Sequence, residues 1–474
     1  MPKILPQIQN IVVVMFENRS LDNLCGWLYS DPSNQPSLYL PANSPAAYDG
    51  LNKNLWNPSN ASYFQGQPPD RIFVQQGTVN YQIPDPDPEE EFDHVTYQLY
   101  GSQTADPNPQ FPMQGFVVDY GNRLLSDPRQ IMQTYTPNQL PVLSALAQSY
   151  AISDAWFCSV PTQTLANRAF VHSGTSNGIL DNGLIPDPFD FDGPTIFNVL
   201  SKMGVGWTVY SDATVVPSLT RTYAPWLWDD SFDDHFQGFD AFQTACANNS
   251  LPQYSFLEPR FLVDPNDQHP PHDVGAGDQF LYQIWQAVSQ SPAWNHILLV
   301  IMYDEHGGCY DHVLPPTGAI TPDIRSDPGK EGFRFDRFGV RIPMVVVSPY
   351  VQAGTVFRSD TAVPYDHTSI LATLRDWLTI PDSLKLTSAR IAAAPNLNQV
   401  LTLSTPRVDK PTITPRPTAL AQTPLTLPIN SLQKSLVTGA ARRLTLDPRM
   451  LLDRIPTRQH AADFFQQSGL RAQK

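Results

Sequence analysis

Short runs of β-branched and other apolar residues recur along the chain and predict buried strands. These runs are Asn10–Met15, Val205–Tyr210, Tyr254–Leu257, Ile297–Tyr303 and Pro343–Ser348. Between the runs, apolar residues recur at helical spacing in Asn138–Gln148, Thr195–Lys202, Asp278–Gln290 and Thr368–Leu378. The alternation of strands and helices predicts an α/β fold, with a mostly parallel central sheet covered by helices on both faces.

Three segments interrupt this alternation. Residues 31–112 are rich in Pro, Asn and Tyr, and residues 212–253 are rich in aromatics and Asp, so both predict long loops or a cap over the sheet. Residues 403–430 are rich in Pro and Thr, which is typical of an extended linker, and residues 431–474 predict a short helical appendage. We therefore expect one main domain over residues 1–402, with cap-like insertions at about 31–112 and 212–253.

The composition excludes some classes of protein. Hydrophobic residues make up 41% of the 474 positions, which is enough for a packed core. The net charge of −15 argues against a general nucleic-acid-binding protein, because such proteins need a basic surface. A phosphate-bearing substrate remains compatible with this charge, since a bound cation can supply local positive charge. The four cysteines include no CxxC pair, so they do not predict a disulfide framework.

The N-terminal region carries no recognisable signal peptide. Its apolar run, Ile11–Phe16, ends at Glu17 and is shorter than a secretory signal requires. A membrane-spanning helix needs about 20 apolar residues, and the sequence has no such run. We expect a chain without a transmembrane segment, located in the cytoplasm or exported by a route that leaves no cleavable signal.

Two of the predicted strands end in adjacent polar residues. Glu17 and Asn18 follow the first strand, and Asp304 and Glu305 follow the strand Ile297–Tyr303. Ligand sites in open α/β sheets gather beyond the carboxyl ends of the strands, so these four side chains are expected to converge. The alternative is a pair of solvated turns.

The stretch from Tyr303 to Val313, YDEHGGCYDHV, is more specific than the strand ends alone. Adjacent carboxylates repel one another unless a cation or an arginine lies between them, so Asp304 and Glu305 at this position suggest a metal. The Gly-Gly pair after His306 permits a sharp turn or a close approach to a ligand. His306 and His312 are interpreted as supporting or structural residues rather than as ligands.

The turn from Ser159 to Arg168, SVPTQTLANR, offers hydroxyl groups after another predicted strand. A hydroxyl nucleophile needs a fixed position and a lowered pKa, both of which metal coordination supplies. Asn167 and Arg168 are suited to orient the loop or to hold phosphate oxygens. Without this context, a threonine in such a turn is an ordinary turn residue.

Four histidines lie in polar, loop-like segments and are able to protonate a leaving alkoxide near neutral pH. They are His94, His269, His272 and His367.

The stretch from Gly174 to Gly178 matches the GxSxG elbow of serine esterases, but that elbow needs a strand before it and a helix directly after it. The following ILDNGLIPDP is turn-like, which disfavours an esterase.

Taken together, these motifs resemble the phosphoesterase family that contains bacterial phospholipases C and acid phosphatase A. The resemblance extends over roughly residues 8–380, with the motifs in the order found in the family. The matching pieces are VVVMFENRSLDNLCGWL, HVTYQLYG, MQGFVVDY, WFCSVPTQTLANRAFVHSGTSNG, WTVYSD, NDQHPPHDVGAGDQF, LLVIMYDEHGGCYDHVLPP, RFGVRIPMVVVSPYV and YDHTSILATLRDWL.

The resemblance implies an alkaline-phosphatase-like fold with one metal. It places the metal ligands at Glu17, Asn18, Asp304 and Glu305, and the nucleophile at Thr164, three residues ahead of Asn167. His94 and His269 align with active-site histidines that contact the phosphate or the leaving group, and His272 and His367 align less clearly. The turn reads PTQTLANR where many relatives read PGPTxPNR, so Thr162 competes with Thr164.

The implied donors are all oxygen atoms, which favours Ca²⁺, Mg²⁺ or Mn²⁺, with Zn²⁺ compatible but less natural. The implied activity is metal-dependent hydrolysis of a phospholipid head group such as phosphocholine, through a phosphothreonyl intermediate. The alternatives are an acid phosphatase acting on soluble phosphomonoesters and a binding module without turnover. The expected partner is a phospholipid, with peripheral membrane contact, or a small phosphoester; nucleic acid is not expected.

Overall fold

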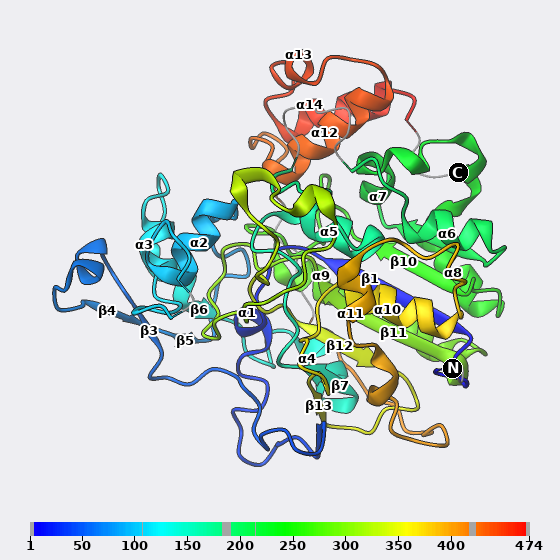
Figure 1. Ribbon diagram of the computed structural model, residues 1–474, viewed down its shortest axis with the longest axis horizontal. Helices are drawn as coiled ribbons and strands as arrows, with labels where there is room; N and C mark the ends of the chain where they lie inside the picture. The colour runs from blue at the N-terminus through cyan, green and yellow to red at the C-terminus, as the bar shows by residue number, and fades with distance from the viewer. Residues whose placement is uncertain (1–3, 107, 183–190, 214, 417–422, 471–474) are drawn as a thin grey trace.

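The computed structural model describes residues 4–106, 108–182, 191–213, 215–416 and 423–470. Within these residues, the centre is a nine-stranded sheet with the order β2-β13-β7-β12-β11-β1-β10-β8-β9 (Figure 1). The strands are β1 (Asn10–Phe16), β2 (Leu38–Leu40), β7 (Ala151–Ser153), β8 (Trp207–Ser211), β9 (Phe236–Gly238), β10 (Tyr254–Glu258), β11 (Ile297–Tyr303), β12 (Met344–Val347) and β13 (Thr355–Phe357).

The sheet is mostly parallel, as predicted. Strand β1 lies between β10 and β11 and runs parallel to both, while β12 is antiparallel to its neighbours β11 and β7. All seven residues of β1 and of β11 are buried, which explains their continuous apolar character. The five predicted apolar runs correspond to β1, β8, β10, β11 and β12, and the strand predicted before the Thr164 turn corresponds to β7.

Helices flank the sheet in two groups. Helices α4 and α8 pack against α9, whereas α5 packs against α6 and α10, and α10 also contacts α11. The four predicted helices correspond to α4, α6, α9 and α10. The helices are α1 (Leu21–Cys25), α2 (Phe92–Tyr100), α3 (Phe116–Gly121), α4 (Pro141–Ser149), α5 (Thr164–Ser173), α6 (Ile196–Lys202), α7 (Leu219–Tyr223), α8 (Phe239–Ala247), α9 (Val274–Gln290), α10 (Thr368–Trp377), α11 (Ala389–Ala393), α12 (Ser431–Arg443), α13 (Pro448–Leu452) and α14 (Arg458–Gln467).

The two insertions supply the two edge strands of the sheet. Strand β2, from residues 31–112, pairs with β13 at one edge, and β9, from residues 212–253, pairs with β8 at the other. The first insertion also forms the hairpin of β3 (Trp56–Pro58) and β4 (Arg71–Phe73), which extends to the left in Figure 1. Its strand β5 (Gln75–Gln76) pairs with β6 (Gln133–Thr134).

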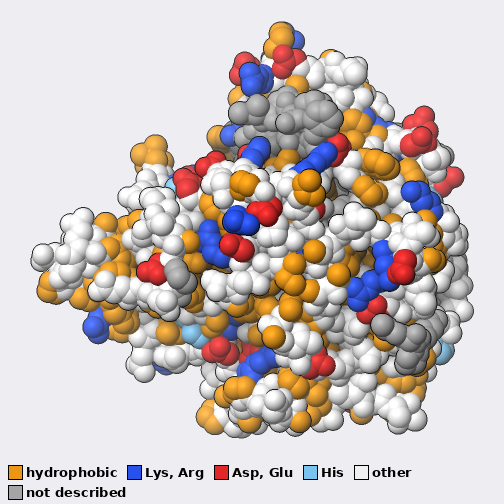
Figure 2. All heavy atoms as spheres, viewed as in Figure 1, with side chains coloured by type: hydrophobic (Ala, Val, Ile, Leu, Met, Phe, Trp, Pro, Cys, Tyr) orange, Lys and Arg blue, Asp and Glu red, His pale blue; other side chains and the backbone are white. Residues whose placement is uncertain are grey.

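The C-terminal residues pack on the main body. Residues 403–416 contain no helix or strand, and α12 to α14 lie together at the top of Figure 1. Leu432, Leu436 and Val437 of α12 are fully buried in the same core as the central strands. No helix among the described residues is long and apolar enough to cross a bilayer. Figure 2 shows acidic and basic side chains interspersed over the visible face.

Candidate active site

The ends of β1 and β11 bring four polar side chains together, as the sequence predicts. The two strands pair in register up to Phe16 and Tyr303, so the residues that follow emerge at the same edge of the sheet. The backbone N–H of Asn18 donates to Asp304 Oδ1 at 3.0 Å, which ties the two strand ends together. The residues Glu17, Asn18, Asp304 and Glu305 are all fully buried.

Thr164 is the first residue of α5 and faces this cluster. Its Oγ1 lies 3.3 Å from Glu17 Oε2 and 3.4 Å from Asn18 Oδ1. By contrast, the hydroxyl of Thr162 donates to the carbonyl oxygen of Leu180. Thr164 therefore presents its hydroxyl to the cluster and Thr162 does not. At the start of a helix, the helix dipole also stabilises negative charge on the Thr164 oxygen.

Asn167 holds the turn in this shape. Its side chain accepts a hydrogen bond from the Val160 N–H at 3.1 Å and donates to the carbonyl oxygens of Val160 and Thr162 at 3.1 and 2.8 Å. Arg168, on the next position of α5, pairs with Glu17 through Nε at 3.0 Å and through Nη2. The loop-orienting role expected of Asn167 thus has a direct structural basis, and Arg168 fixes Glu17.

The cluster carries more negative charge than its protein contacts neutralise. Asp304 Oδ2 and Glu305 Oε1 are buried, and neither makes a hydrogen bond among the described residues, although Arg168 Nε lies 3.6 Å from Asp304 Oδ2. Burial, followed by the charge of Asp304, raises the pKa of Glu305 well above its ordinary value. Burial likewise raises the pKa of Glu17, against the opposing effect of Arg168.

The donor chemistry of these residues suits a divalent cation. Three carboxylates and an amide oxygen form a hard donor set, which suits Ca²⁺, Mg²⁺ or Mn²⁺. The turn behind them is tight, because Glu305 Oε2 accepts from the Gly307 N–H at 2.6 Å. Gly307 has a φ of 59°, and a Cβ there would lie 2.3 Å from the Asn18 carbonyl oxygen. Only glycine fits at this position.

Acidic residues that the sequence analysis did not single out adjoin the cluster. Glu90 is buried; its Oε2 accepts from Asn18 Nδ2 at 2.5 Å, and its Oε1 accepts from the hydroxyl of Ser431 at 3.0 Å. One potential ligand atom of each of Asp87, Glu90 and His269 lies within 4.8 Å of the others. The signal in the sequence was the acidic run Glu89-Glu90-Glu91, directly before the segment of His94.

His269 and His272 lie beside the cluster. His269 Nε2 is 3.1 Å from Asn18 Nδ2, and its Nδ1 is 2.6 Å from the carbonyl oxygen of Pro270. Burial lowers the pKa of His269 to about 4, so the ring is neutral near pH 7. The carbonyl then fixes the proton on Nδ1 and leaves Nε2 as an acceptor. His272 Nδ1 contacts Asp267 Oδ1 at 2.6 Å, and burial lowers its pKa.

The other histidines have different surroundings. His367 is buried, with Nε2 2.5 Å from the backbone oxygen of Asp304. His94 is about one-third exposed and contacts Asp119 on α3 at 2.8 Å. In the described part of the chain, no hydrogen bond joins His94 to Thr164 or to the four clustered ligand residues. His306 contacts Gln98, and His312 contacts Asp22, in line with supporting roles.

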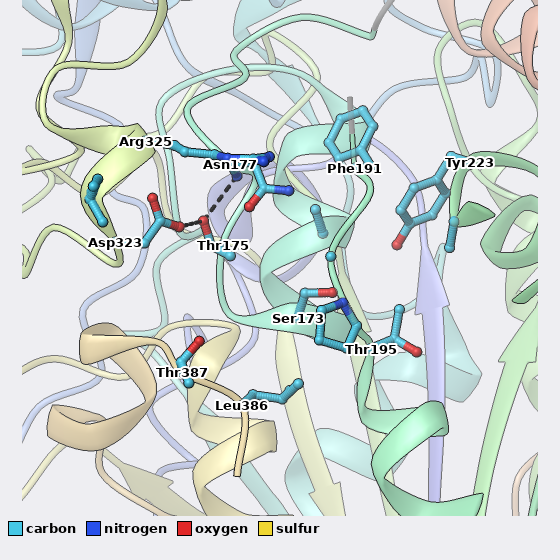
Figure 3. Close-up of a pocket in the computed structure, with 15 residues that line it drawn as sticks. Ser173, Thr175, Asn177, Phe191, Thr195, Tyr223, Asp323, Arg325, Leu386 and Thr387 are labelled. Carbon is cyan, nitrogen blue, oxygen red and sulfur yellow. Dashed lines mark hydrogen bonds between the residues drawn. The ribbon is translucent and has the colours of Figure 1, made fainter. Parts of the chain in front are cut away.

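The GxSxG match does not form a nucleophile elbow. Helix α5, not a strand, precedes it, and Gly174 ends that helix with a φ of 75°. The Ser176 hydroxyl is buried and donates to the Ile179 carbonyl oxygen. A cavity of about 220 Å³ lies at this end of α5, away from Thr164, with Thr175 and Asn177 in its wall (Figure 3). Ser176 is absent from its lining, which removes the esterase interpretation.

Comparison with known proteins identifies the family. The model of the phosphoesterase family matches residues 8–381. Non-specific phospholipase C3 of Arabidopsis thaliana is 32% identical over 421 residues, covering 86% of this chain and 76% of the plant protein. Phospholipase C B of Mycobacterium tuberculosis (strain H37Rv) is 27% identical over 478 residues, covering 90% of this chain and 84% of the bacterial protein.

Among solved structures, an alkaline phosphatase superfamily protein from Vibrio parahaemolyticus aligns with 54% of this chain and 63% of its own, with a TM-score of 0.32 and 11% identity. The family match spans both strand ends, the Thr164 turn and the histidine segments described above. The chain therefore belongs to the phosphoesterase family and is a phosphoric ester hydrolase.

Proposed function

We propose that the protein is a metal-dependent phosphoesterase of the phospholipase C type that cleaves a phospholipid head group, such as phosphocholine, through a phosphothreonyl intermediate. The observation that carries this proposal is the Thr164 hydroxyl, which faces Glu17 and Asn18 across a buried, oxygen-rich cluster at the start of α5. The names of the plant and mycobacterial relatives support a phospholipid as substrate.

Glu17, Asn18, Asp304 and Glu305, with the Thr164 oxygen, are the residues that would hold the cation. When bound, a divalent cation lowers the pKa of a nearby hydroxyl and neutralises charge that develops on the phosphate. The buried carboxylates leave an anionic substrate little other positive charge at this point, because Arg168 is already paired with Glu17.

The acceptor that the Thr164 hydroxyl faces is Glu17, with Oε2 at 3.3 Å. In the proposed reaction, Thr164 Oγ1 bonds to phosphorus while its proton passes to Glu17. The bond from phosphorus to the glycerol oxygen breaks, and that oxygen takes up a proton from a histidine of the site. His269 is the histidine that adjoins the cluster, with Nε2 3.1 Å from the amide nitrogen of Asn18.

The second half of the reaction reverses these roles. Water gives a proton to that histidine and attacks the phosphothreonyl group, and Thr164 Oγ1 leaves phosphorus and recovers its proton from Glu17. This step releases the phosphorylated head group. His272, held by Asp267, lies next to this path and is assigned a supporting role. His94, with Asp119 as its partner, is assigned to the approach of the substrate rather than to the proton relay.

Aromatic residues of the insertions are candidates for the wall of a choline site, and the commoner alternative is that they are core residues. In the structure, Trp56, Tyr63 and Phe64 pack edge to face or tilted against one another and against Phe111. Phe232 packs on Trp207 of the sheet. These five aromatic side chains of the insertions are half-buried and packed on other rings, so their packing favours neither interpretation. The head-group preference is decided by substrate hydrolysis.

The experiment compares Thr164→Ala with Thr162→Ala, using p-nitrophenyl phosphorylcholine and p-nitrophenyl phosphate as substrates. Thr164→Ala is expected to lower kcat by roughly 10³-fold or more, because the nucleophile is lost. Thr162→Ala is expected to keep turnover within about tenfold, because its hydroxyl only supports the loop. Acid-quenched wild-type protein should carry phosphothreonine at position 164.

Three results would contradict the proposal in different ways. Full turnover by Thr164→Ala would show that Thr164 is not the nucleophile. Hydrolysis of p-nitrophenyl phosphate alone would favour the acid phosphatase. An absence of hydrolysis of either compound, with Ca²⁺, Mg²⁺ or Mn²⁺ present, would favour a binding module.

A further inference from the structure

The turn that follows α3 exposes two adjacent leucines. The side chains of Leu124 and Leu125 are 83% and 90% exposed. They form the middle of a four-residue turn, which the N–H of Ser126 closes by donating to the carbonyl oxygen of Arg123 at 3.2 Å. Single exposed leucines are common, but a turn apex made of two is an exposed apolar tip, where polar residues and glycine are usual.

The backbone of this leucine turn, residues 123–126, is held in an unfavourable conformation. Leu125 has a φ of 67°, in the left-handed region that glycine or asparagine normally occupies at the third position of such a turn. The turn is nevertheless fixed from both sides, because the Ser126 hydroxyl donates to the Tyr120 carbonyl oxygen at 2.7 Å and Arg123 pairs with Glu89. A rigid base therefore presents two apolar side chains to solvent.

The leucine turn is braced on the segment that borders the active site. Arg123 contacts Glu89, and the next residue, Glu90, accepts the hydrogen bond from Asn18 described above. The hydroxyl of Tyr120, on α3, donates to the carbonyl oxygen of Pro86 at 2.7 Å. Helix α3 lies beside α2, which belongs to the first insertion, at the left of Figure 1. The apolar tip is thus tied to the wall of the catalytic cluster.

We propose that the leucine turn inserts into the surface of a zwitterionic phospholipid bilayer and brings the active site to its substrate. The inference rests on the proposed phospholipid substrate. Both nearby arginines are already paired, Arg123 with Glu89 and Arg129 with Asp127, and the whole chain carries a charge of −15. The turn therefore offers apolar side chains and no unpaired basic group to a membrane, and anionic lipids would repel the negatively charged protein. These properties favour a zwitterionic phosphatidylcholine surface.

The experiment measures partitioning onto sucrose-loaded phosphatidylcholine vesicles by sedimentation. The double variant Leu124→Asp, Leu125→Asp is expected to bind about tenfold more weakly or worse, because two apolar side chains no longer enter the lipid. Hydrolysis of the soluble p-nitrophenyl phosphorylcholine should stay within about twofold of the wild type, since neither leucine contacts the catalytic cluster.

The matched control is Val408→Asp. Val408 is 94% exposed, and its neighbour Arg407 donates to the carbonyl oxygen of Ser149. Ser149 lies just before β7 begins, whereas the site lies beyond the ends of β1 and β11, so Val408 is on the opposite side of the sheet from the site. This variant should bind vesicles like the wild type. Equal thermal unfolding of all three proteins would confirm that the fold is intact.

Vesicle partitioning requires no turnover, so it is separable from the proposed function. If the wild-type protein does not bind the vesicles, or if the double variant binds equally well, the inference is wrong. If the double substitution changes only the sedimentation of vesicle-free protein, the leucines contact a second copy of this chain instead of lipid. Leucine-dependent binding by a protein that hydrolyses neither compound would overturn the proposed function alone.

Discussion

At the residue scale, the side chains best predicted from sequence are those at strand ends. Glu17, Asn18, Asp304 and Glu305 follow two apolar runs, and any parallel pairing of those runs brings them to one edge. Glu90 and Asp267 do not follow a predicted strand, and the acidic run that contains Glu90 does not by itself indicate which residues it approaches. They reach the cluster only because segments far apart in sequence fold over the sheet, so their contacts with Asn18 and His272 are visible only in the structure.

The stability of the folded state should depend on pH through His94. Its hydrogen bond to Asp119 raises the pKa of His94 from its ordinary value of 6.5 to about 9. A histidine with a raised pKa stabilises the folded state fully below pH 6.5, and this contribution is lost as the pH rises through 9. Because the ring is about one-third exposed, the contribution is about 1 kcal/mol or less.

We therefore expect His94→Asn to unfold at a lower temperature than the wild type at pH 6, and the difference to shrink towards pH 9.5. Thermal unfolding followed by circular dichroism measures this. The control is His460→Asn, since the ring of His460 contacts the Thr457 hydroxyl and not a carboxylate. A difference that is constant across this pH range would show that Asp119 does not hold a protonated His94.

At the element scale, the longer helices and strands were predicted well. A strand buried on both faces leaves a continuous apolar run, and a helix with one buried face leaves apolar residues at helical spacing. The three-residue strands β2 and β9 were not, since a strand of that length shows no period. The antiparallel direction of β12 was not predicted either, because an apolar run does not encode its direction. The role of α12 depends on tertiary packing, which its arginine-rich sequence does not reveal.

Helix α12 is expected to contribute to global stability. Leu436 is fully buried in the main core, so Leu436→Ala should lower the free energy of unfolding by about 2–5 kcal/mol. Leu446→Ala is the control, because Leu446 is 46% exposed and its truncation should cost about 0.5 kcal/mol or less. Urea unfolding measures both. A separate early transition for the tail, or no effect of Leu436→Ala, would contradict this packing.

At the scale of the whole molecule, the buried acidic cluster is a local excess of charge that a cation should relieve. A ligand that binds only the folded state at a concentration of about 100 times its Kd stabilises that state by about 2.7 kcal/mol. We expect Ca²⁺, Mg²⁺ or Mn²⁺ to raise the unfolding temperature by a few degrees, and a chelator to reverse the shift and abolish hydrolysis.

Glu305→Gln separates this metal effect from general salt effects. The variant should lose the response to the cation, and its metal-free form should be at least as stable as the wild type, because one buried negative charge is gone. Glu331→Gln, in a region remote from the strand ends in sequence, is a neutral comparison that should respond like the wild type. An undiminished shift in Glu305→Gln would place the cation elsewhere.

The buried position of α12 also has a consequence for how the protein is made. The helix is synthesised long after β1, yet the two fill the same core. A chain still attached to the ribosome before residue 431 lacks both this packing and the hydroxyl that contacts Glu90. The packing of the core and the contact with Glu90 should therefore be complete only after residues 431–443 have been synthesised.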